Sequence, residues 1–351
     1  MGTPLKKQTQ KQQFYRKKWF LWTAGSIAAV VIVIAIWFKV SPWPGAMLIR
    51  FVFSQNDAKT TQELAKHQPR VAIASTLNQQ YKAGDADAFI DIYYPEGTTT
   101  KLPVIVWTHG GAWVSGGRTD NAPYYKLLAA EGFTVVSADY SLGPERTYPT
   151  AVHQLNEMYK YITANADRLH ADTDRVVLAG DSAGSQLSSQ MAALVTNPAY
   201  AADMQMTPSL KPEQLKGVVL NCGIYKMEGL IQPDPALPKI IGWGDDVSVW
   251  AYLGTRDFTA ASKLTQMSAF YHVTKDFPAT YISGGNGDPL TNAQSKPFAD
   301  KLESLGVQVT RLFYADDHSP SLPHEYQFNL DNEDGTKAFT ESVAFITRVT
   351  K

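Results

Sequence analysis

The chain has 351 residues, of which 44% are hydrophobic, and its formal net charge at pH 7 is −1. This length suits one large domain with an appendage. Seven basic residues lie between Lys6 and Lys39, before any acidic residue, and without them the rest of the chain has a net charge of −8. A remainder this acidic excludes any compositional argument for nucleic-acid binding.

The first predicted element is an apolar helix. No charged residue occurs over the 20 positions from Trp19 to Phe38, and a helix of that length spans about 30 Å, the thickness of a bilayer core. We predict a basic cytoplasmic tail over 1–18 and a single-pass anchor in the cell membrane over 19–40, with the remainder extracytoplasmic. The alternatives are a cleaved signal peptide, which usually has a shorter apolar run and a small-x-small cleavage site, and a buried core helix.

Residues 41–69 are predicted to form a juxtamembrane connector with a short helix from Asp57 to Lys66. Pro42 and Pro44 disfavour a helix in the first part of this segment. The stretch 47–53 is apolar enough to lie either on the membrane or on the following domain.

From residue 70 onward, predicted strands alternate with predicted helices. Strands are expected at 88–94, 102–107, 133–138, 175–179, 217–222, 279–283 and 307–314, and helices near 122–131, 150–165, 292–305 and 335–349. This alternation indicates an α/β fold with a mostly parallel sheet and helices on both faces. An irregular, aromatic-rich insertion is expected at 225–277.

The pentapeptide Gly180-Asp-Ser-Ala-Gly184 lies between a predicted strand and a predicted helix. A G-x-S-x-G sequence in that context is typical of a nucleophile elbow, whose tight turn leaves no room for side chains at the glycines. We therefore predict Ser182 as a nucleophile with the Ala183 N–H beside it, ready to bind an oxyanion.

A second Gly-rich motif, His109-Gly-Gly-Ala-Trp113, follows the predicted strand at 102–107. A Gly-Gly pair allows backbone N–H groups to turn toward an anion, so Gly110 and Gly111 are predicted oxyanion donors. The alternative is an ordinary Gly-rich turn, but the elbow further along the chain favours the oxyanion loop.

Three motifs in this order resemble those of the hormone-sensitive-lipase-like carboxylesterases, which have the α/β-hydrolase fold. They are His109-Gly-Gly-Ala-Trp113, Asp139-Tyr-Ser-Leu-Gly-Pro-Glu145 and Gly180-Asp-Ser-Ala-Gly184. The resemblance implies an α/β-hydrolase domain over 70–351 in which the 225–277 insertion is part of a cap; a plain long loop is the alternative. It also implies a serine carboxylesterase with short-chain acyl esters as substrates. Gly143 stands where the family usually has alanine, and we expect no consequence.

In this fold the catalytic acid and base follow the serine in that order. Asp288, in Gly284-Gly-Asn-Gly-Asp-Pro-Leu290, comes directly after a predicted strand and resembles the family's Asp-Pro-Leu acid site. We predict Asp288 as the acid; its alternative role is that of a turn or helix-capping residue.

Two histidines, His318 and His324, lie between the last predicted strand and the last helix. Counted back from that helix, His324 matches the family better, and aromatic residues follow it at the family's spacing. Counted forward from Asp288, His318 is closer to the family's spacing. Because the loop is longer than usual, we predict His324 as the base and keep His318 as the alternative.

The remaining polar residues near the motifs are expected to have supporting roles. His109 should hold its own loop, while Asp139, Glu145 and Asp181 should fix loops through backbone hydrogen bonds. Cys222 is expected to pack in the core. No cluster has metal-ligand spacing and no dinucleotide fingerprint is present, so neither a metal nor a cofactor is predicted.

The predicted partner is therefore a small-molecule ester. Two other functions stay open: a peptidase or amidase on the same scaffold, and a membrane-tethered binding protein that has lost catalysis. The chain keeps a candidate for each catalytic role, which argues against the second of these.

Overall fold

The computed structural model describes residues 5–231, 238–258 and 261–351. It divides into two compact units, Met1–Gly45 and Ala46–Lys351. The first unit contains helix α1 (Leu5–Val40). Within α1, Tyr15–Val40 has a mean hydropathy of 2.3 and is long enough to cross a membrane or to act as a signal sequence.

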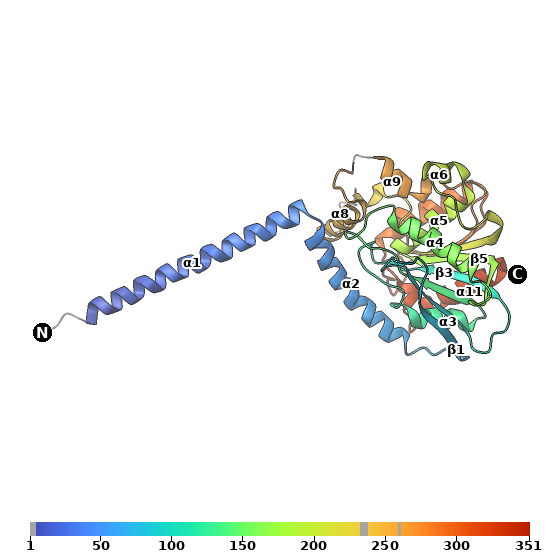
Figure 1. Cartoon of the computed structure of the whole chain (residues 1–351), viewed down its shortest axis with the longest axis horizontal. Coiled ribbons are helices and arrows are strands. Elements are labelled where there is room, and N and C mark those ends of the chain that lie inside the picture. The colour runs from blue at the N-terminus through green and yellow to red at the C-terminus, as the bar shows by residue number, and fades with distance from the viewer. Residues whose placement is uncertain (1–4, 232–237, 259–260) are drawn as a thin grey trace. The chain divides into compact units, whose positions relative to one another are not determined.

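A single eight-stranded sheet forms the centre of the second unit (Figure 1). The strand order is β1-β2-β4-β3-β5-β6-β7-β8, and only the β1–β2 and β2–β4 pairs are antiparallel. The strands are β1 (Ile73–Gln80), β2 (Phe89–Pro95), β3 (Leu102–Thr108), β4 (Thr134–Ala138), β5 (Ala171–Asp181), β6 (Leu215–Asn221), β7 (Ala279–Gly284) and β8 (Val309–Phe313). The predicted mostly parallel sheet is confirmed. The sequence analysis missed β1, a largely exposed edge strand without an apolar face.

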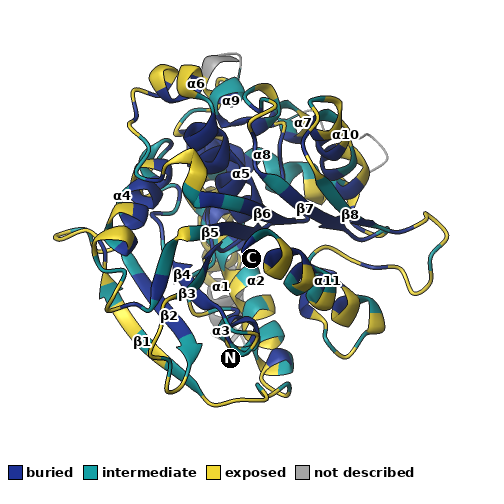
Figure 2. Ribbon diagram, turned by 90° about the vertical axis from the view of Figure 1, so that its right-hand side faces the viewer, coloured by how far each residue is buried: buried dark blue, intermediate teal, exposed yellow. Residues whose placement is uncertain are grey.

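Helices cover both faces of the sheet (Figure 2). α4 (Thr150–Ala164), α5 (Ala183–Thr196) and α10 (Lys296–Ser304) pack on one face, and α3 (Ala122–Ala130) and α11 (Glu333–Val349) on the other. Side chains of successive strand residues point to opposite faces, so Val104 and Val106 join the first core while Ile105 and Trp107 join the second. Shorter elements are α6 (Pro198–Asp203), η1 (Pro212–Gln214), η2 (Ala269–Tyr271), η4 (Tyr326–Phe328) and the π-helical turn η3 (Thr291–Ser295).

The insertion at 225–277 is more helical than we predicted. Its described parts contain α7 (Glu228–Ile231), α8 (Lys239–Leu253) and α9 (Ala261–Met267), whereas 232–237 and 259–260 lie outside the described residues. Several aromatic residues of the segment are buried, among them Tyr225 and Trp250. Tyr252 is buried and stacks on the Trp113 ring at a centroid distance of 5.4 Å. Tertiary packing here overrides weak helix propensity.

Helix α2 (Trp43–Leu64) begins well before the expected Asp57, so that expectation is wrong. Pro44 falls in the first turn, where its missing N–H would have no helical partner. Ala46 and Ile49 pack against α8, and Leu64 is fully buried against the sheet. From Ala46 onward, α2 is therefore part of the core of the second unit.

Gly143 has a structural role that we did not expect. A Cβ atom at this position would lie 2.8 Å from the backbone carbonyl carbon and oxygen of Ala251 in α8. Backbone atoms cannot move aside as a flexible side chain can. The glycine therefore allows α8 to pack closely on the loop after β4.

We predict that Gly143→Ala destabilises the protein by about 1–3 kcal/mol, because an added methyl group overpacks this contact. The measurement is urea unfolding, compared with wild type. Gly244→Ala is a matched control in α8, where nothing lies within 4 Å of the added Cβ. The control should be neutral or stabilising by up to about 1 kcal/mol. Equal midpoints for Gly143→Ala and wild type would contradict the prediction.

Candidate active site

Ser182 occupies the turn between β5 and α5 with φ 50° and ψ −120°, a strained conformation for a residue with a side chain. A Cβ atom at Gly184 would lie 2.0 Å from the Thr108 carbonyl oxygen, and one at Gly180 would lie 2.6 Å from the Gly184 carbonyl carbon. Both glycines are thus required by close backbone approach. This strand–turn–helix arrangement is the geometry of a nucleophile elbow.

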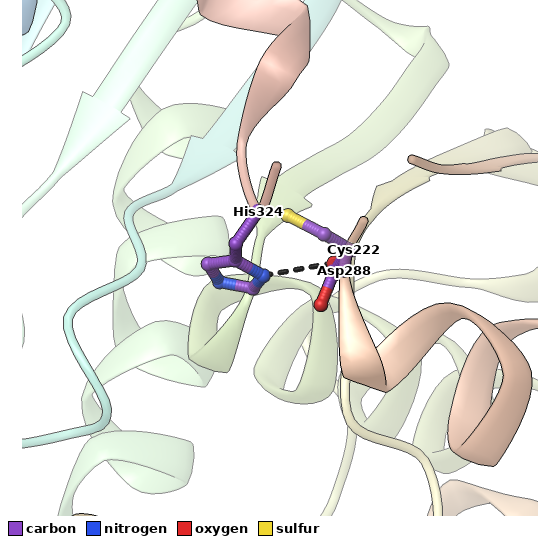
Figure 3. Close-up of side chains that lie close together, drawn as sticks. All are labelled: Cys222, Asp288 and His324. Atoms are coloured by element: carbon purple, nitrogen blue, oxygen red, sulfur yellow. Dashed lines mark hydrogen bonds and ion pairs between the residues drawn. The ribbon is translucent and has the colours of Figure 1, made fainter. Parts of the chain in front are cut away.

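His324 and Asp288 form a pair at the edge of the sheet (Figure 3). Nδ1 of His324 lies 2.9 Å from Oδ2 of Asp288, whose side chain is only 1% exposed. Asn286 connects the two loops: its Oδ1 accepts a hydrogen bond from the Leu322 N–H at 2.9 Å, and its Nδ2 donates to the His318 carbonyl at 2.9 Å. The sequence analysis missed Asn286, although it lies inside the Gly-rich turn that indicated Asp288.

His318 has a different partner. Its Nε2 lies 2.8 Å from Oδ2 of Asp334, in the first turn of α11, and its ring packs against Tyr314. These contacts hold the start of α11. The structure therefore pairs Asp288 with His324 and gives His318 a structural environment.

Residues around the nucleophile elbow lie close to the loop that carries His324. The Asp181 carboxyl group lies close enough to Glu325 for the two side chains to interact, and the Cys222 sulfur lies within 4.8 Å of a ring nitrogen of His324. The Ser182 N–H donates to the Asn221 carbonyl at 2.9 Å. Within the described ranges, the Ser182 hydroxyl itself makes no hydrogen bond with either histidine. Catalytic hydrogen bonds are often long in enzymes without substrate and tighten when it binds.

The oxyanion loop differs from our expectation at one residue. The Gly110 N–H donates to Oδ2 of Asp181 at 2.8 Å, and Trp107 Nε1 donates to Oδ1 at 2.7 Å. The prediction that Gly110 binds an oxyanion is therefore wrong for this conformation, because its only hydrogen is already used. Within the described part of the chain, no hydrogen bond occupies the N–H of Gly111 or Ala183. Gly111 has a φ of 99°, which favours glycine.

Asp181 and Glu325 form a carboxyl pair that the sequence analysis did not foresee. Burial raises the pKa of Asp181 well above its usual value, and the nearby Glu325 charge raises it further. Glu325 has a φ of 61°, a conformation that a side chain adopts rarely. Its carboxyl oxygen also lies 4.0 Å from His324 Nε2.

Cys222 lies beside His324 and Asp288, and the ligand atoms of the three residues are within 4.8 Å of one another. Such a group could hold a metal ion, a possibility that the sequence spacing did not indicate. Burial, however, raises the pKa of the Cys222 thiol to about 11. A protonated thiol is a poor metal ligand and a poor nucleophile. Cys222 is 1% exposed, in agreement with the predicted packing role.

The supporting residues mostly behave as expected. His109 places Nδ1 2.7 Å from the Gly110 carbonyl oxygen, and Asp139 accepts a hydrogen bond from the Arg118 N–H at 2.7 Å. Glu145 differs, because it binds the guanidinium group of Arg50 through both of its oxygens. That ion pair fixes α2 to the loop after β4.

Comparison with known proteins agrees with this fold. The BD-FAE family model matches residues 90–302. Carboxylesterase NlhH of Mycobacterium tuberculosis is 37% identical over 250 residues, which cover 69% of this chain and 72% of that protein. An alpha/beta hydrolase of Acanthamoeba polyphaga mimivirus is 28% identical over 173 residues, 45% of this chain and half of the viral protein.

Among solved structures, esterase B from Lactobacillus rhamnosis superposes with a TM-score of 0.74 at 17% identity, covering 88% of this chain and 96% of that chain. At that identity the likeness concerns the fold. Together with the sequence matches, it places the chain in a defined class: it belongs to the carboxylesterase family of the α/β-hydrolases.

Proposed function

We propose that this carboxylesterase cleaves short-chain carboxylic esters through an acyl-enzyme intermediate on Ser182. The observation that carries the proposal is the combination of a strained serine at the elbow with an imidazole–carboxylate pair on the adjoining loop. A serine hydroxyl needs both a base and a group that orients the base. Among the described residues, His324 and Asp288 have the geometry for these roles.

In the proposed mechanism, His324 Nε2 removes the proton from Ser182 as the hydroxyl oxygen attacks the ester carbonyl. Asp288 accepts the Nδ1 hydrogen bond, which fixes the tautomer and stabilises the imidazolium. The N–H groups of Gly111 and Ala183 bind the oxyanion, while Asp181 anchors the loop through Gly110. His324 then protonates the leaving alcohol. Water attacks the acyl-enzyme with the same base and releases the acid.

The N-terminal helix is proposed to anchor the enzyme in the cell membrane, with the N-terminus in the cytoplasm and the hydrolase outside. Support comes from the apolar span Tyr15–Val40 and from the basic residues before it. Protease digestion of intact cells tests the orientation. Cleavage of a C-terminal tag with protection of an N-terminal tag is the expected result, and the reverse pattern would exclude it.

The substrate class is tested with p-nitrophenyl esters of increasing acyl length and aminoacyl p-nitroanilides of matched size. Fastest turnover of acetate or butyrate esters, with labelling of Ser182 by a fluorophosphonate, is expected. Faster turnover of the anilides would instead favour an amidase. Absence of both turnover and labelling would favour a binding protein.

A pH dependence follows from the environment of His324. Burial lowers the pKa of its imidazole, whereas the Asp288 carboxylate, 2.9 Å from Nδ1, raises it, and the resulting pKa lies above the usual 6.5. Only the neutral imidazole accepts the serine proton, so kcat/KM should fall as pH decreases through this raised pKa. We predict an acid-limb midpoint above pH 6.5 and a lower midpoint in Asp288→Asn. An acid limb below 6.5 in wild type would contradict this.

A further inference from the structure

Helix α2 has two distinct faces within the hydrolase unit. Its inner face packs on the protein: Ala46 is fully buried and Ile49 is 8% exposed, in contact with a cluster that includes Val114 and Val247. Other side chains in the same turns point outward. Leu48, Phe51 and Val52 are 48%, 64% and 46% exposed.

The apolar character of the outer face is confined to the first turns of α2. Further along, the exposed positions are mostly polar and include Gln55, Asn56 and Lys59. The apolar portion follows the span Tyr15–Val40 in the chain, with α2 beginning at Trp43. At about 1.5 Å per residue, Val52 lies within roughly 20 Å of chain from the end of that span. The outer face therefore changes from apolar to polar with distance along the chain from the apolar span.

The neighbouring helix α8 shows the same feature. Ile240 and Ile241, at its start, are 68% and 37% exposed. α8 packs against α2 through Val247 and Ala251 (Figure 1). Exposed large apolar side chains thus gather on two helices in contact, and such a concentration marks an interaction surface.

This surface lies close to the proposed active site. The inner face of α2 belongs to the same cluster as Ala112 of the oxyanion loop. Farther along α2, Asp57 lies close enough to Glu325 for the two charges to interact. On α8, Asp245 interacts in the same way with His324. Helix α2 thus packs on the oxyanion loop with its inner face and leaves its outer face uncovered in the described structure.

We propose that Leu48, Phe51 and Val52 insert into the surface of the lipid bilayer, so that the active site takes ester substrates dissolved in the membrane. The proposal rests on the proposed anchoring and esterase activity. An amphipathic helix binds at the bilayer interface by burying its apolar side chains among the lipid headgroups. Here the preceding span would keep the helix at that interface, which removes most of the cost of association.

The first test measures depth in the bilayer. Cys222 is the only cysteine and is 1% exposed, so a cysteine placed on α2 can be labelled selectively with an environment-sensitive dye. Full-length Phe51→Cys and the matched Lys59→Cys, two turns further along, are labelled in phosphatidylcholine nanodiscs. Lipids brominated in the acyl chain should quench the dye at 51 several-fold more than at 59. Equal weak quenching at both positions, or dye–dye contact at 51 from a second copy, would overturn the proposal.

The second test separates this inference from the catalytic assignment. The variant Leu48→Ser/Phe51→Ser/Val52→Ser should hydrolyse water-soluble p-nitrophenyl acetate at the wild-type rate. It should lose several-fold on a long-chain ester dissolved in the nanodisc. The control Gln55→Ser/Asn56→Ser/Lys59→Ser should keep both rates. An unchanged rate on the membrane ester overturns the inference, whereas an inactive wild type on acetate refutes the proposed function.

Discussion

Replacement of Ser182 by alanine should abolish hydrolysis of p-nitrophenyl acetate, with a loss of about 10³ to 10⁶-fold in kcat. Without the hydroxyl no acyl-enzyme can form, and only the oxyanion donors and substrate binding contribute to the residual rate. The side chain is 8% exposed and makes no hydrogen bond in the described structure. The fold should therefore survive the substitution.

The control for this variant is its urea unfolding midpoint, which should stay close to that of wild type. Fluorophosphonate labelling should disappear together with activity. Retention of most of the activity by a folded Ser182→Ala protein would eliminate Ser182 as the nucleophile.

Replacement of His324 by alanine should reduce kcat by a similar factor, because the serine would lose the base that Asp288 orients. His318→Ala should change kcat no more than a few-fold. Its imidazole binds Asp334 at 2.8 Å, so its loss should appear mainly as reduced stability of α11. Steady-state kinetics on p-nitrophenyl acetate and urea unfolding of both variants separate the two roles.

The comparison of the two histidines is decisive because each variant serves as the control for the other. A large loss of kcat in His318→Ala, together with a nearly normal kcat in His324→Ala, would exchange the two assignments. Asp288→Asn provides a further check. It should lower kcat by up to about 10⁴-fold through the wrong imidazole tautomer.

The sequence predicted those parts of the site that depend on local backbone geometry. Gly180 and Gly184 are needed because a Cβ atom at either position would clash with nearby backbone atoms. The elbow can therefore be predicted from a short sequence motif. Asp288 was predictable because acids in this fold follow a strand through a tight turn. The choice between His318 and His324 was harder, since both occur in one long loop and only packing decides which of them reaches Asp288.

Features that depend on contacts between distant loops could not be predicted. Glu325 and Asp181 are far apart in the chain, and nothing in the residues around either one indicates that their carboxyl groups meet. The same contact explains the error at Gly110, whose N–H is bound by Asp181. The helix α8 was missed because its glycine and aromatic residues have weak helix propensity, and burial against the rest of the domain stabilises it.

The packing of α2 also determines how much of the chain the catalytic unit needs in order to stay intact. A protein shortened to start at residue 70 would keep every proposed catalytic residue. It would nevertheless uncover the faces of Val114, Val247 and Ala251 that Ala46 and Ile49 now cover. Helix α2, which follows the proposed anchor in the chain, thus also supports the part of the second unit next to the oxyanion loop.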